Sequence, residues 1–215
     1  MAYKYILFDL DGTISDSNEG ITKGVQATLA HFGIDIVDRT ELLRYIGPPI
    51  RETLSTQFGL TSEQVDEAMV IYGKYYSEKG LYENVLYDGV CDTIRELKRR
   101  GKVIALATSK AQVFAERILE YFGIADCFAH ICGGELSGYS TKKSDVMRRA
   151  LDNCGVADLH DAIIIGDRKY DIIGAKETGI ASIGVLYGFG DYDELRDAGA
   201  DWIVEDIADV LEILV

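Results

Sequence analysis

The chain has 215 residues, 47% of them hydrophobic, and a formal charge of −14 at pH 7. This length fits one substantial core with at most a modest inserted module, rather than two large independent domains. The negative charge argues against nucleic acid or an anionic membrane surface as the main partner, because both attract basic patches.

Short apolar runs alternate with helical patterns along the chain, which is typical of crossover units and a parallel sheet. Several predicted strands are apolar throughout, as expected when both faces of a sheet are covered. The strands span Tyr3–Asp9, Val103–Thr108, His130–Gly133, Ala162–Gly166, Ser182–Leu186 and Trp202–Val204. The helices span Cys91–Arg100, Val113–Phe122, Ser144–Cys154, Ile172–Thr178, Tyr192–Ala198 and Ile207–Leu214. The fold class is therefore α/β, with a Rossmann-like, doubly wound parallel sheet.

Residues 17–82, which we call the helical insert, interrupt this alternation. Helical periodicity appears around Ile21–Phe32, Glu41–Ile46, Arg51–Phe58 and Ser62–Tyr76, with no convincing strand. We predict an α-helical domain inserted into an α/β core formed by residues 1–16 and 83–215. Pro48 and Pro49, the only prolines, predict a rigid corner within it.

The chain carries no sequence signal for export or for a structural metal site. No apolar run approaches about 20 residues. The N-terminus enters a strand pattern without a basic region and a cleavage site, so we expect a cytoplasmic protein. The four cysteines show no CxxC spacing and the three histidines are not clustered near them, so free thiols are expected.

The motif Asp9-Leu10-Asp11-Gly12-Thr13 follows the apolar run Tyr5–Phe8. A buried strand would therefore end in two carboxylates and a tight turn. Two carboxylates this close are costly to bury without a nearby cation or a shared proton. Mg²⁺ is the natural candidate, because it prefers hard oxygen ligands and leaves positions open for water and phosphate.

Reactive groups in an open parallel sheet gather at the carboxyl ends of the strands, and two more strand ends carry suitable groups. Thr108, Ser109 and Lys110 offer a hydroxyl and backbone N–H groups before a helix, although an N-cap would look the same. Asp167 and Asp171 follow the apolar strand Ala162–Gly166 in a GDxxxD motif. Helix capping is the alternative for Asp167, but the first motif favours metal ligation.

Lys142 and Lys143 stand at the start of a predicted helix. A lysine there is electrostatically unfavourable to the helix, so a buried anionic partner would explain one of them. A solvated surface position explains the other.

These four motifs, in this order, resemble the haloacid dehalogenase (HAD) superfamily of phosphotransferases over nearly the whole chain. The helical insert resembles the C1-type cap of that superfamily. The segments Tyr45–Arg51 and Gly166–Asp171 resemble its phosphoglycolate phosphatase-like branch. The resemblance implies a Mg²⁺-dependent phosphatase that hydrolyses a small phosphate monoester, such as phosphoglycolate, through an aspartyl phosphate. We expect a monomer or weak homodimer, with no nucleic acid polymer or membrane as partner.

The resemblance also implies a role for each acidic residue. Asp9 is the nucleophile, because a carboxylate can split one difficult displacement into two easier ones. Asp11 protonates the leaving alkoxide and then activates the hydrolytic water. Mg²⁺ is bound by Asp9, Asp167 and the backbone carbonyl of Asp11, while Asp171 holds a coordinated water.

The resemblance assigns the phosphoryl group to the second and third motifs. Thr108 and the backbone N–H groups near Ser109 and Lys110 hold its oxygens, and a lysine neutralises their charge. The branch often places proline after this lysine, and neither lysine here is followed by one. Lys143 is chosen over Lys142 because Lys143-Ser144-Asp145-Val146 matches a Lys-x-acidic-aliphatic variant.

Substrate choice is expected to lie mainly in the helical insert. Arg51 is the preferred contact for a carboxylate or second phosphate, with a solvent-facing charge as the alternative, and Arg168 adds positive charge at the site rim. Gly12 and Thr13 are expected to contact the substrate. An aromatic-rich stretch contains Tyr72, Tyr75 and Tyr76. We interpret it as the core of the insert or as a self-association face. The alternative is a platform on which a nucleobase stacks, so nucleoside monophosphates stay a candidate substrate class.

Several other functions use the same residue types. A 5′-nucleotidase shares the whole mechanism, and a phosphosugar mutase would carry a histidine soon after the first motif, which is absent here. A receiver domain is near half this size, and a module that only binds a phosphorylated ligand would not need the full catalytic set. A phosphonate hydrolase needs a Schiff-base lysine, for which Lys23 is available.

Overall fold

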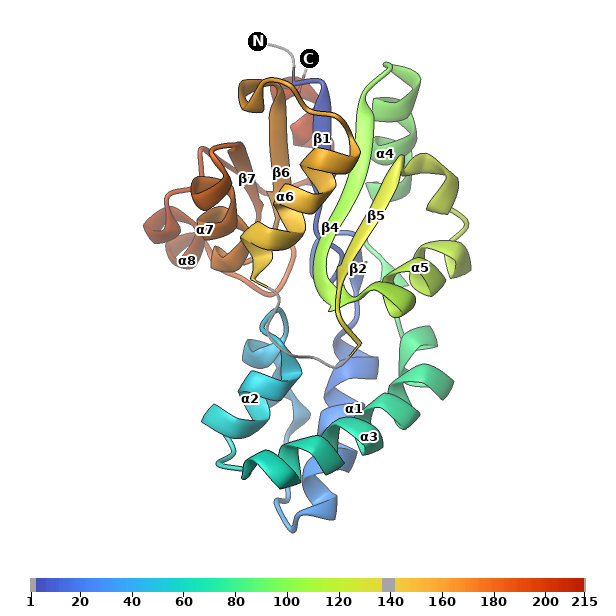
Figure 1. Ribbon diagram of the computed structural model, residues 1–215, viewed down its shortest axis with the longest axis vertical. Coiled ribbons are helices and arrows are strands. Elements are labelled where there is room, and N and C mark those ends of the chain that lie inside the picture. The colour runs from blue at the N-terminus through green and yellow to red at the C-terminus, as the bar shows by residue number, and fades with distance from the viewer. Residues whose placement is uncertain (1–2, 137–141, 215) are drawn as a thin grey trace.

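The computed structural model describes residues 3–136 and 142–214, so the other positions of the predicted core lie outside it. A sheet of six parallel strands has the order β5-β4-β1-β6-β7-β8 (Figure 1). The strands are β1 (Tyr5–Phe8), β4 (Val103–Ala111), β5 (His130–Gly134), β6 (Ala162–Gly166), β7 (Ala181–Val185) and β8 (Trp202–Val204). The predicted fold class is confirmed.

Helices cover both faces of this sheet because successive side chains of each strand point to opposite sides. In β1, Ile6 and Phe8 join the core that includes residues of α4 (Val90–Arg99), α5 (Gln112–Tyr121) and α9 (Val210–Ile213). Tyr5 and Leu7 join the opposite core with α6 (Lys143–Asn153) and α7 (Lys169–Thr178). A further helix, α8 (Tyr192–Ala198), precedes β8. Two-sided burial explains the continuous apolar runs of the strands.

Several predicted helices differ from the observed ones. Helix α7 begins at Lys169 rather than Ile172, because the carboxylate of Asp171 accepts a hydrogen bond from the backbone N–H of Arg168 and closes the first turn. The stretch Glu41–Ile46 lies in a 3₁₀ helix, η1 (Arg39–Tyr45). The C-terminal stretch is split into η5 (Ile207–Asp209) and α9.

The helical insert lies at one end of the sheet (Figure 1). It contains α1 (Asn18–His31), η1, α2 (Ile50–Thr56), α3 (Ser62–Glu78) and η2 (Gly80–Tyr82). Two short strands that the sequence did not predict flank it, β2 (Ser15–Asp16) and β3 (Val85–Leu86), and they pair antiparallel. The chain therefore leaves and re-enters the core through adjacent strands.

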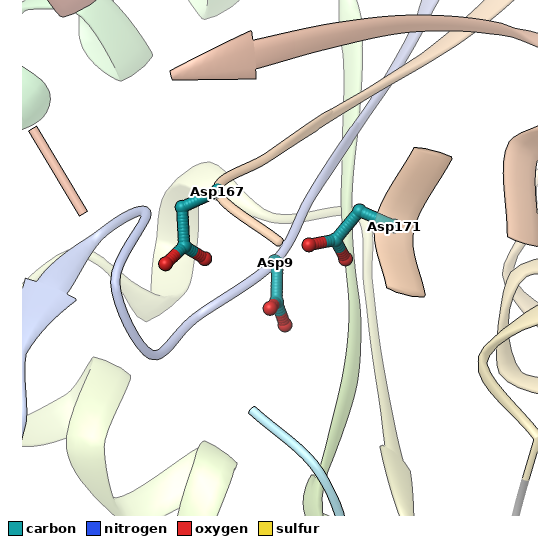
Figure 2. A group of neighbouring side chains, drawn as sticks. All are labelled: Asp9, Asp167 and Asp171. Carbon is teal, nitrogen blue, oxygen red and sulfur yellow. The ribbon is translucent and has the colours of Figure 1, made fainter. Parts of the chain in front are cut away.

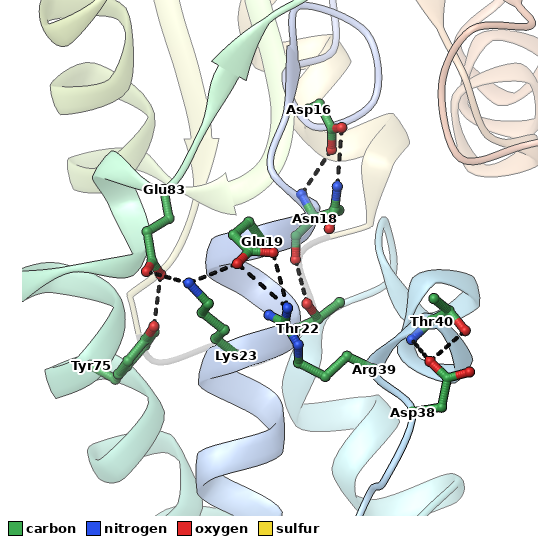
Figure 3. A network of polar contacts seen from close by, with 10 residues as sticks. All are labelled: Asp16, Asn18, Glu19, Thr22, Lys23, Asp38, Arg39, Thr40, Tyr75 and Glu83. Atoms are coloured by element: carbon green, nitrogen blue, oxygen red, sulfur yellow. Dashed lines mark hydrogen bonds and ion pairs between the residues drawn. The ribbon is translucent and has the colours of Figure 1, made fainter.

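A polar network connects the insert helices to the returning chain (Figure 3). The ammonium nitrogen of Lys23 lies 2.7 Å from a carboxylate oxygen of Glu19 and 2.8 Å from one of Glu83. The Tyr75 hydroxyl donates to Glu83 at 2.7 Å, and Arg39 pairs with Glu19 at 3.2 Å. Glu83 lies just before β3, so the network ties α1, η1 and α3 to the connection with the core.

The four cysteines are free thiols, as predicted, and Cys127 and Cys132 are buried. Within the described ranges, no helix is long and apolar enough to cross a membrane.

Candidate active site

The site lies where the chain direction across the sheet reverses. Strand β1 is flanked by β4 on one side and β6 on the other, so crossovers depart from it in both directions. Such a switch point leaves a crevice at the carboxyl ends of the strands. Asp9 directly follows β1, Thr108 lies in the last part of β4, and Asp167 directly follows β6. The topology thus brings three of the predicted motifs to one place.

Three carboxylates form a buried cluster at this switch point (Figure 2). Asp9, Asp167 and Asp171 each offer an oxygen atom, and these atoms lie within 4.8 Å of one another. The exposed fractions of these residues are 6%, 0% and 1%. The acidic residues from both ends of the chain therefore converge, as the sequence predicted.

The turn after Asp9 is built around Asp167. Gly12 has a φ of +82°, and a Cβ atom there would lie 2.0 Å from a carboxylate oxygen of Asp167, so only glycine fits. The Thr13 hydroxyl donates to Asp167 at 3.3 Å, and the backbone N–H of Phe189 donates to it at 2.8 Å. Thr13, expected to contact the substrate, is fully buried, and its hydroxyl contacts one member of the acidic cluster.

Lys143 supplies the positive charge within the cluster. Its ammonium nitrogen lies 2.7 Å from an oxygen of Asp9 and 2.7 Å from an oxygen of Asp171, and the residue is 8% exposed. Lys142 is exposed. Of the two adjacent lysines that the sequence offered, Lys143 is the one that contacts the carboxylates.

The cluster contains fewer positive than negative groups. Burial raises the pKa of Asp167 well above its usual range, and the carboxylates of Asp171 and Asp9 raise it further. Burial also raises the pKa of Asp171, to about 6, although Lys143 opposes that shift. For Lys143, burial disfavours the charged form, but Asp171 and Asp9 outweigh it and raise its pKa. One ammonium group faces three carboxylates.

A divalent cation fits this arrangement. Three converging carboxylate oxygens are the hard donors that Mg²⁺ prefers, and like-charge repulsion among them is what such an ion relieves. Nitrogen and sulfur ligands that would favour zinc or copper are absent from this acidic group of described residues. Asp9, Asp167 and Asp171 could therefore hold a metal ion.

Asp11 lies beside the cluster, and its two carboxylate oxygens have different surroundings. Its Oδ2 atom is 2.9 Å from the ammonium nitrogen of Lys110. Its Oδ1 atom is buried and has no hydrogen-bond partner among the described residues. The Lys110 ammonium also donates to the Tyr76 hydroxyl at 2.8 Å, and Tyr76 belongs to α3 of the helical insert. The sequence does not predict this contact of core and insert, because Lys110 and Tyr76 lie far apart on elements with no shared pattern.

A pocket of about 440 Å³ opens between the core and the helical insert. Asp11, Ser109 and Lys110 belong to its core side. Most of the other lining residues are apolar or aromatic, and they include Ile21, Tyr45, Pro48, Pro49, Ile50, Met69, Tyr72, Tyr76 and Phe114. Among the described residues that line it, Lys110 alone has a cationic side chain. The pocket suits a group with apolar surface.

Thr108 and Ser109 lie in the last part of β4, next to Lys110. Thr108 is 1% exposed, and its hydroxyl accepts a hydrogen bond of 3.3 Å from the backbone N–H of Lys110. Ser109 lines both the pocket and a second opening that reaches Lys143. Ser109 therefore lines one opening with Asp11 and another with Lys143.

The two arginines expected near the substrate have protein partners. Arg51 pairs with Asp66 at 2.7 Å and does not line the 440 Å³ pocket. Arg168 was expected at the site rim, but it is 6% exposed and its guanidinium pairs with Glu194 at 2.8 Å. It also donates to the backbone carbonyl of Ile46 in the insert. Its charge is therefore paired within the core, and its hydrogen bond to Ile46 joins core and insert, a position that the strand-end pattern did not reveal.

Lys23 is unsuited to a Schiff base. Hydrogen bonds to Glu19 and Glu83 raise its pKa, whereas an amine that attacks a carbonyl must lose its proton readily. This argues against the phosphonate hydrolase alternative.

The fold and the site together define a phosphotransferase that uses an aspartate-rich centre at the carboxyl ends of a parallel sheet. The chain belongs to the haloacid dehalogenase-like hydrolase family, whose model matches residues 6–185. The predicted superfamily and enzyme class, a HAD-type phosphoric monoester hydrolase, are confirmed.

Three relatives illustrate the similarity. A protein named 5′-nucleotidase from Pseudomonas aeruginosa is 41% identical, over 100% of this chain and 96% of its own. A phosphoglycolate phosphatase from Vibrio cholerae is 29% identical, over 98% of this chain and 96% of its own. The crystal structure of a predicted phosphatase from Clostridium acetobutylicum is 41% identical with a TM-score of 0.95, and the match covers 100% and 99% of the two chains.

Proposed function

We propose that this protein is a Mg²⁺-dependent phosphatase that hydrolyses a small phosphate monoester through an aspartyl phosphate. The observation that carries the proposal is the position of Asp9. It directly follows β1, lies 2.7 Å from Lys143, and shares the buried cluster with Asp167 and Asp171. A carboxylate that contacts a lysine and belongs to a candidate cation site is placed to attack phosphorus.

In the first step, a carboxylate oxygen of Asp9 forms a bond to phosphorus as the bond from phosphorus to the ester oxygen breaks. Asp11 gives its proton to that oxygen, so the leaving group departs as a neutral alcohol. The products are the alcohol, the aspartyl phosphate on Asp9 and the ionised carboxylate of Asp11. The unpartnered Oδ1 atom of Asp11 is the oxygen available for this transfer.

In the second step, the carboxylate of Asp11 takes a proton from water as the water oxygen bonds to phosphorus. The bond between phosphorus and the Asp9 oxygen breaks, which releases inorganic phosphate and restores the Asp9 carboxylate. Asp11 ends protonated, ready for the next substrate.

Asp9, Asp167 and the backbone carbonyl of Asp11 would hold Mg²⁺, with Asp171 beside them. When bound, the ion supplies positive charge that offsets the repulsion between the nucleophile and the phosphate. Lys143, Thr108 and backbone N–H groups near Ser109 would stabilise the phosphoryl oxygens.

We propose that the helical insert, residues 17–82, acts as a C1-type cap that closes over this site. The 440 Å³ pocket between insert and core supports this role, since closure there would exclude water from the reaction. The antiparallel pair of β2 and β3 is the candidate hinge.

Two substrate classes are candidates, and the pocket favours one of them. Phosphoglycolate, the expectation from branch likeness, has a small leaving group with a carboxylate. The pocket is large and mainly apolar, and its single lysine is already paired with Asp11. A nucleoside monophosphate has a bulkier, uncharged leaving group whose ring can pack on aromatic side chains. The relative named 5′-nucleotidase is consistent with this choice.

A direct comparison tests the substrate. We expect kcat/KM at fixed Mg²⁺ to be higher for nucleoside 5′-monophosphates than for 2-phosphoglycolate. Phe114→Ala should lower kcat/KM for the nucleotides by about 10-fold and leave that for phosphoglycolate less affected, because only the larger group packs there. A preference for phosphoglycolate would overturn the nucleotide assignment while leaving the phosphatase mechanism intact.

We place the reaction in the cytoplasm, with the protein as a monomer or weak homodimer. The four free thiols are in keeping with a reducing compartment.

A further inference from the structure

We infer that Lys110 is a positioning residue that holds Asp11 ready for proton transfer, and that Tyr76 makes this arrangement depend on closure of the helical insert. The inference rests on the proposed phosphatase function. It gives a role to the side chains of Lys110 and Tyr76, which take no direct part in the two chemical steps. It concerns the orientation of Asp11 rather than direct contact with phosphate.

The contacts of Lys110 with Asp11 and Tyr76 join three elements and are buried. Lys110 follows the apolar part of β4, Asp11 lies in the turn after β1, and Tyr76 lies near the end of α3. The side chains of Lys110 and Asp11 are 7% and 13% exposed, and Tyr76 is 1% exposed. A charge pair with so little solvent depends strongly on its geometry and on its remaining hydrogen bonds. The Tyr76 hydroxyl provides one of these bonds.

The pairing with Lys110 makes the two carboxylate oxygens of Asp11 inequivalent. Lys110 occupies Oδ2 at 2.9 Å, while Oδ1 is buried and without a hydrogen-bond partner in the described part of the chain. A carboxyl group that can rotate would present either oxygen to the substrate. With Oδ2 held, Oδ1 is the one left to meet the leaving oxygen, which fixes the direction of proton transfer.

Tyr76 links this orientation to the insert. Its ring stacks on Tyr72 of the same helix at 5.4 Å and meets Phe114 of the core edge-on at 5.3 Å. Because Tyr76 is carried by α3, displacement of the insert would withdraw its hydroxyl from Lys110. The lysine would then be free to follow solvent and release Oδ2. Asp11 is therefore oriented for proton donation only when the insert is closed and water is excluded.

Two substrates of similar size separate this role from a structural one. Benzyl phosphate leaves as an alkoxide that needs a proton, whereas 4-nitrophenyl phosphate leaves as a stable phenolate that does not. The ratio kcat/KM covers the steps up to departure of the leaving group, so hydrolysis of the aspartyl phosphate does not enter it. A defect in Asp11 orientation should therefore appear in kcat/KM with the first substrate and not with the second.

Lys110→Met keeps the aliphatic stem and removes the charge. We expect kcat/KM for benzyl phosphate to fall by about 100-fold, and that for 4-nitrophenyl phosphate by less than about threefold. Lys110→Arg should restore part of the benzyl phosphate activity, because a cation again reaches Asp11. Lys74→Met, at an exposed lysine on α3, is the matched control and should change neither ratio.

Tyr76→Phe removes only the hydroxyl and retains the ring contacts, so it serves if Lys110→Met does not fold. It should lower kcat/KM for benzyl phosphate by about 10-fold with the same dependence on leaving group. In the double variant Lys110→Met/Tyr76→Phe, the loss should equal that of Lys110→Met alone, because Tyr76 acts through the lysine.

The inference is overturned if Lys110→Met lowers kcat/KM equally for both substrates or for neither, or if the losses in the double variant add. Failure of the proposed function gives a different result: the wild-type protein would then hydrolyse neither substrate in an Asp9-dependent way.

Discussion

The ammonium nitrogen of Lys143 lies 2.7 Å from a carboxylate oxygen of Asp9, and it reaches Asp171 at the same distance. One lysine thus faces the proposed nucleophile and a second buried carboxylate. With Asp167 nearby, the cluster still carries more negative than positive charge. This imbalance underlies the predictions on activity, metal binding and pH.

Lys143 and Lys142 are adjacent, and only one of them should matter. We expect Lys143→Met to lower kcat/KM by about 100-fold or more, because a positive charge near the phosphoryl oxygens is lost. The metal-free protein should also lose about 3 kcal/mol of unfolding free energy, since two buried carboxylates lose their partner. Lys142→Met, which changes an exposed lysine, is the control. Equal losses in the two variants would contradict the assignment of Lys143.

Asp167 should limit stability in the absence of metal. Burial and two neighbouring carboxylates raise its pKa, so its ionised form is unfavourable in the folded protein. Asp167→Asn should stabilise the metal-free protein by about 1–2 kcal/mol and abolish the rise in Tm that Mg²⁺ produces.

Thermal unfolding with EDTA and with Mg²⁺ measures both effects of the Asp167 substitution. Asp88→Asn, at an exposed aspartate, should change neither. A Mg²⁺-induced rise in Tm that survives Asp167→Asn would remove this residue from the metal site.

The pKa of Asp171 predicts a pH dependence of stability. Because the folded-state pKa is raised from 3.8 to about 6, the folded protein binds more protons than the unfolded chain between these values. The contribution of Asp171 to the free energy of unfolding is therefore present at low pH and is lost as the pH rises through about 6. The raised pKa of Asp167 acts in the same direction.

Urea unfolding in EDTA at several pH values between 4 and 7 tests this dependence, with the range taken from these two pKa shifts. The difference in unfolding free energy between wild type and Asp171→Asn isolates the residue from the other carboxylates. As the pH rises, the wild type should become less stable relative to Asp171→Asn. A difference that stays constant would show that the carboxyl titrates normally in the folded protein.

Much of the fold and the acidic cluster could be predicted, because apolar runs mark the strands and parallel topology brings strand ends together. Asp9 and Asp167 follow two such runs, so their meeting required no knowledge of side-chain packing. The choice of Lys143 over Lys142 came from its resemblance to a variant of the family motif, and burial then separates the two lysines.

Several contacts that the sequence could not reveal depend on how the insert packs on the core. Lys110 and Tyr76 are 34 positions apart on elements with no shared pattern. Arg168 looked like a rim charge, but its partners are Glu194 and a carbonyl of the insert. The strands β2 and β3 are too short for an apolar run to mark them.

The account depends most on covalent phosphorylation of Asp9. The direct measurement is rapid acid quenching during turnover of a phosphate monoester, followed by borohydride reduction and peptide mass spectrometry. We predict that reduction converts residue 9 alone to homoserine, and that Asp9→Asn shows neither this product nor turnover while remaining folded. Turnover by wild type with the modification on another residue, or substantial turnover by Asp9→Asn, would contradict the account.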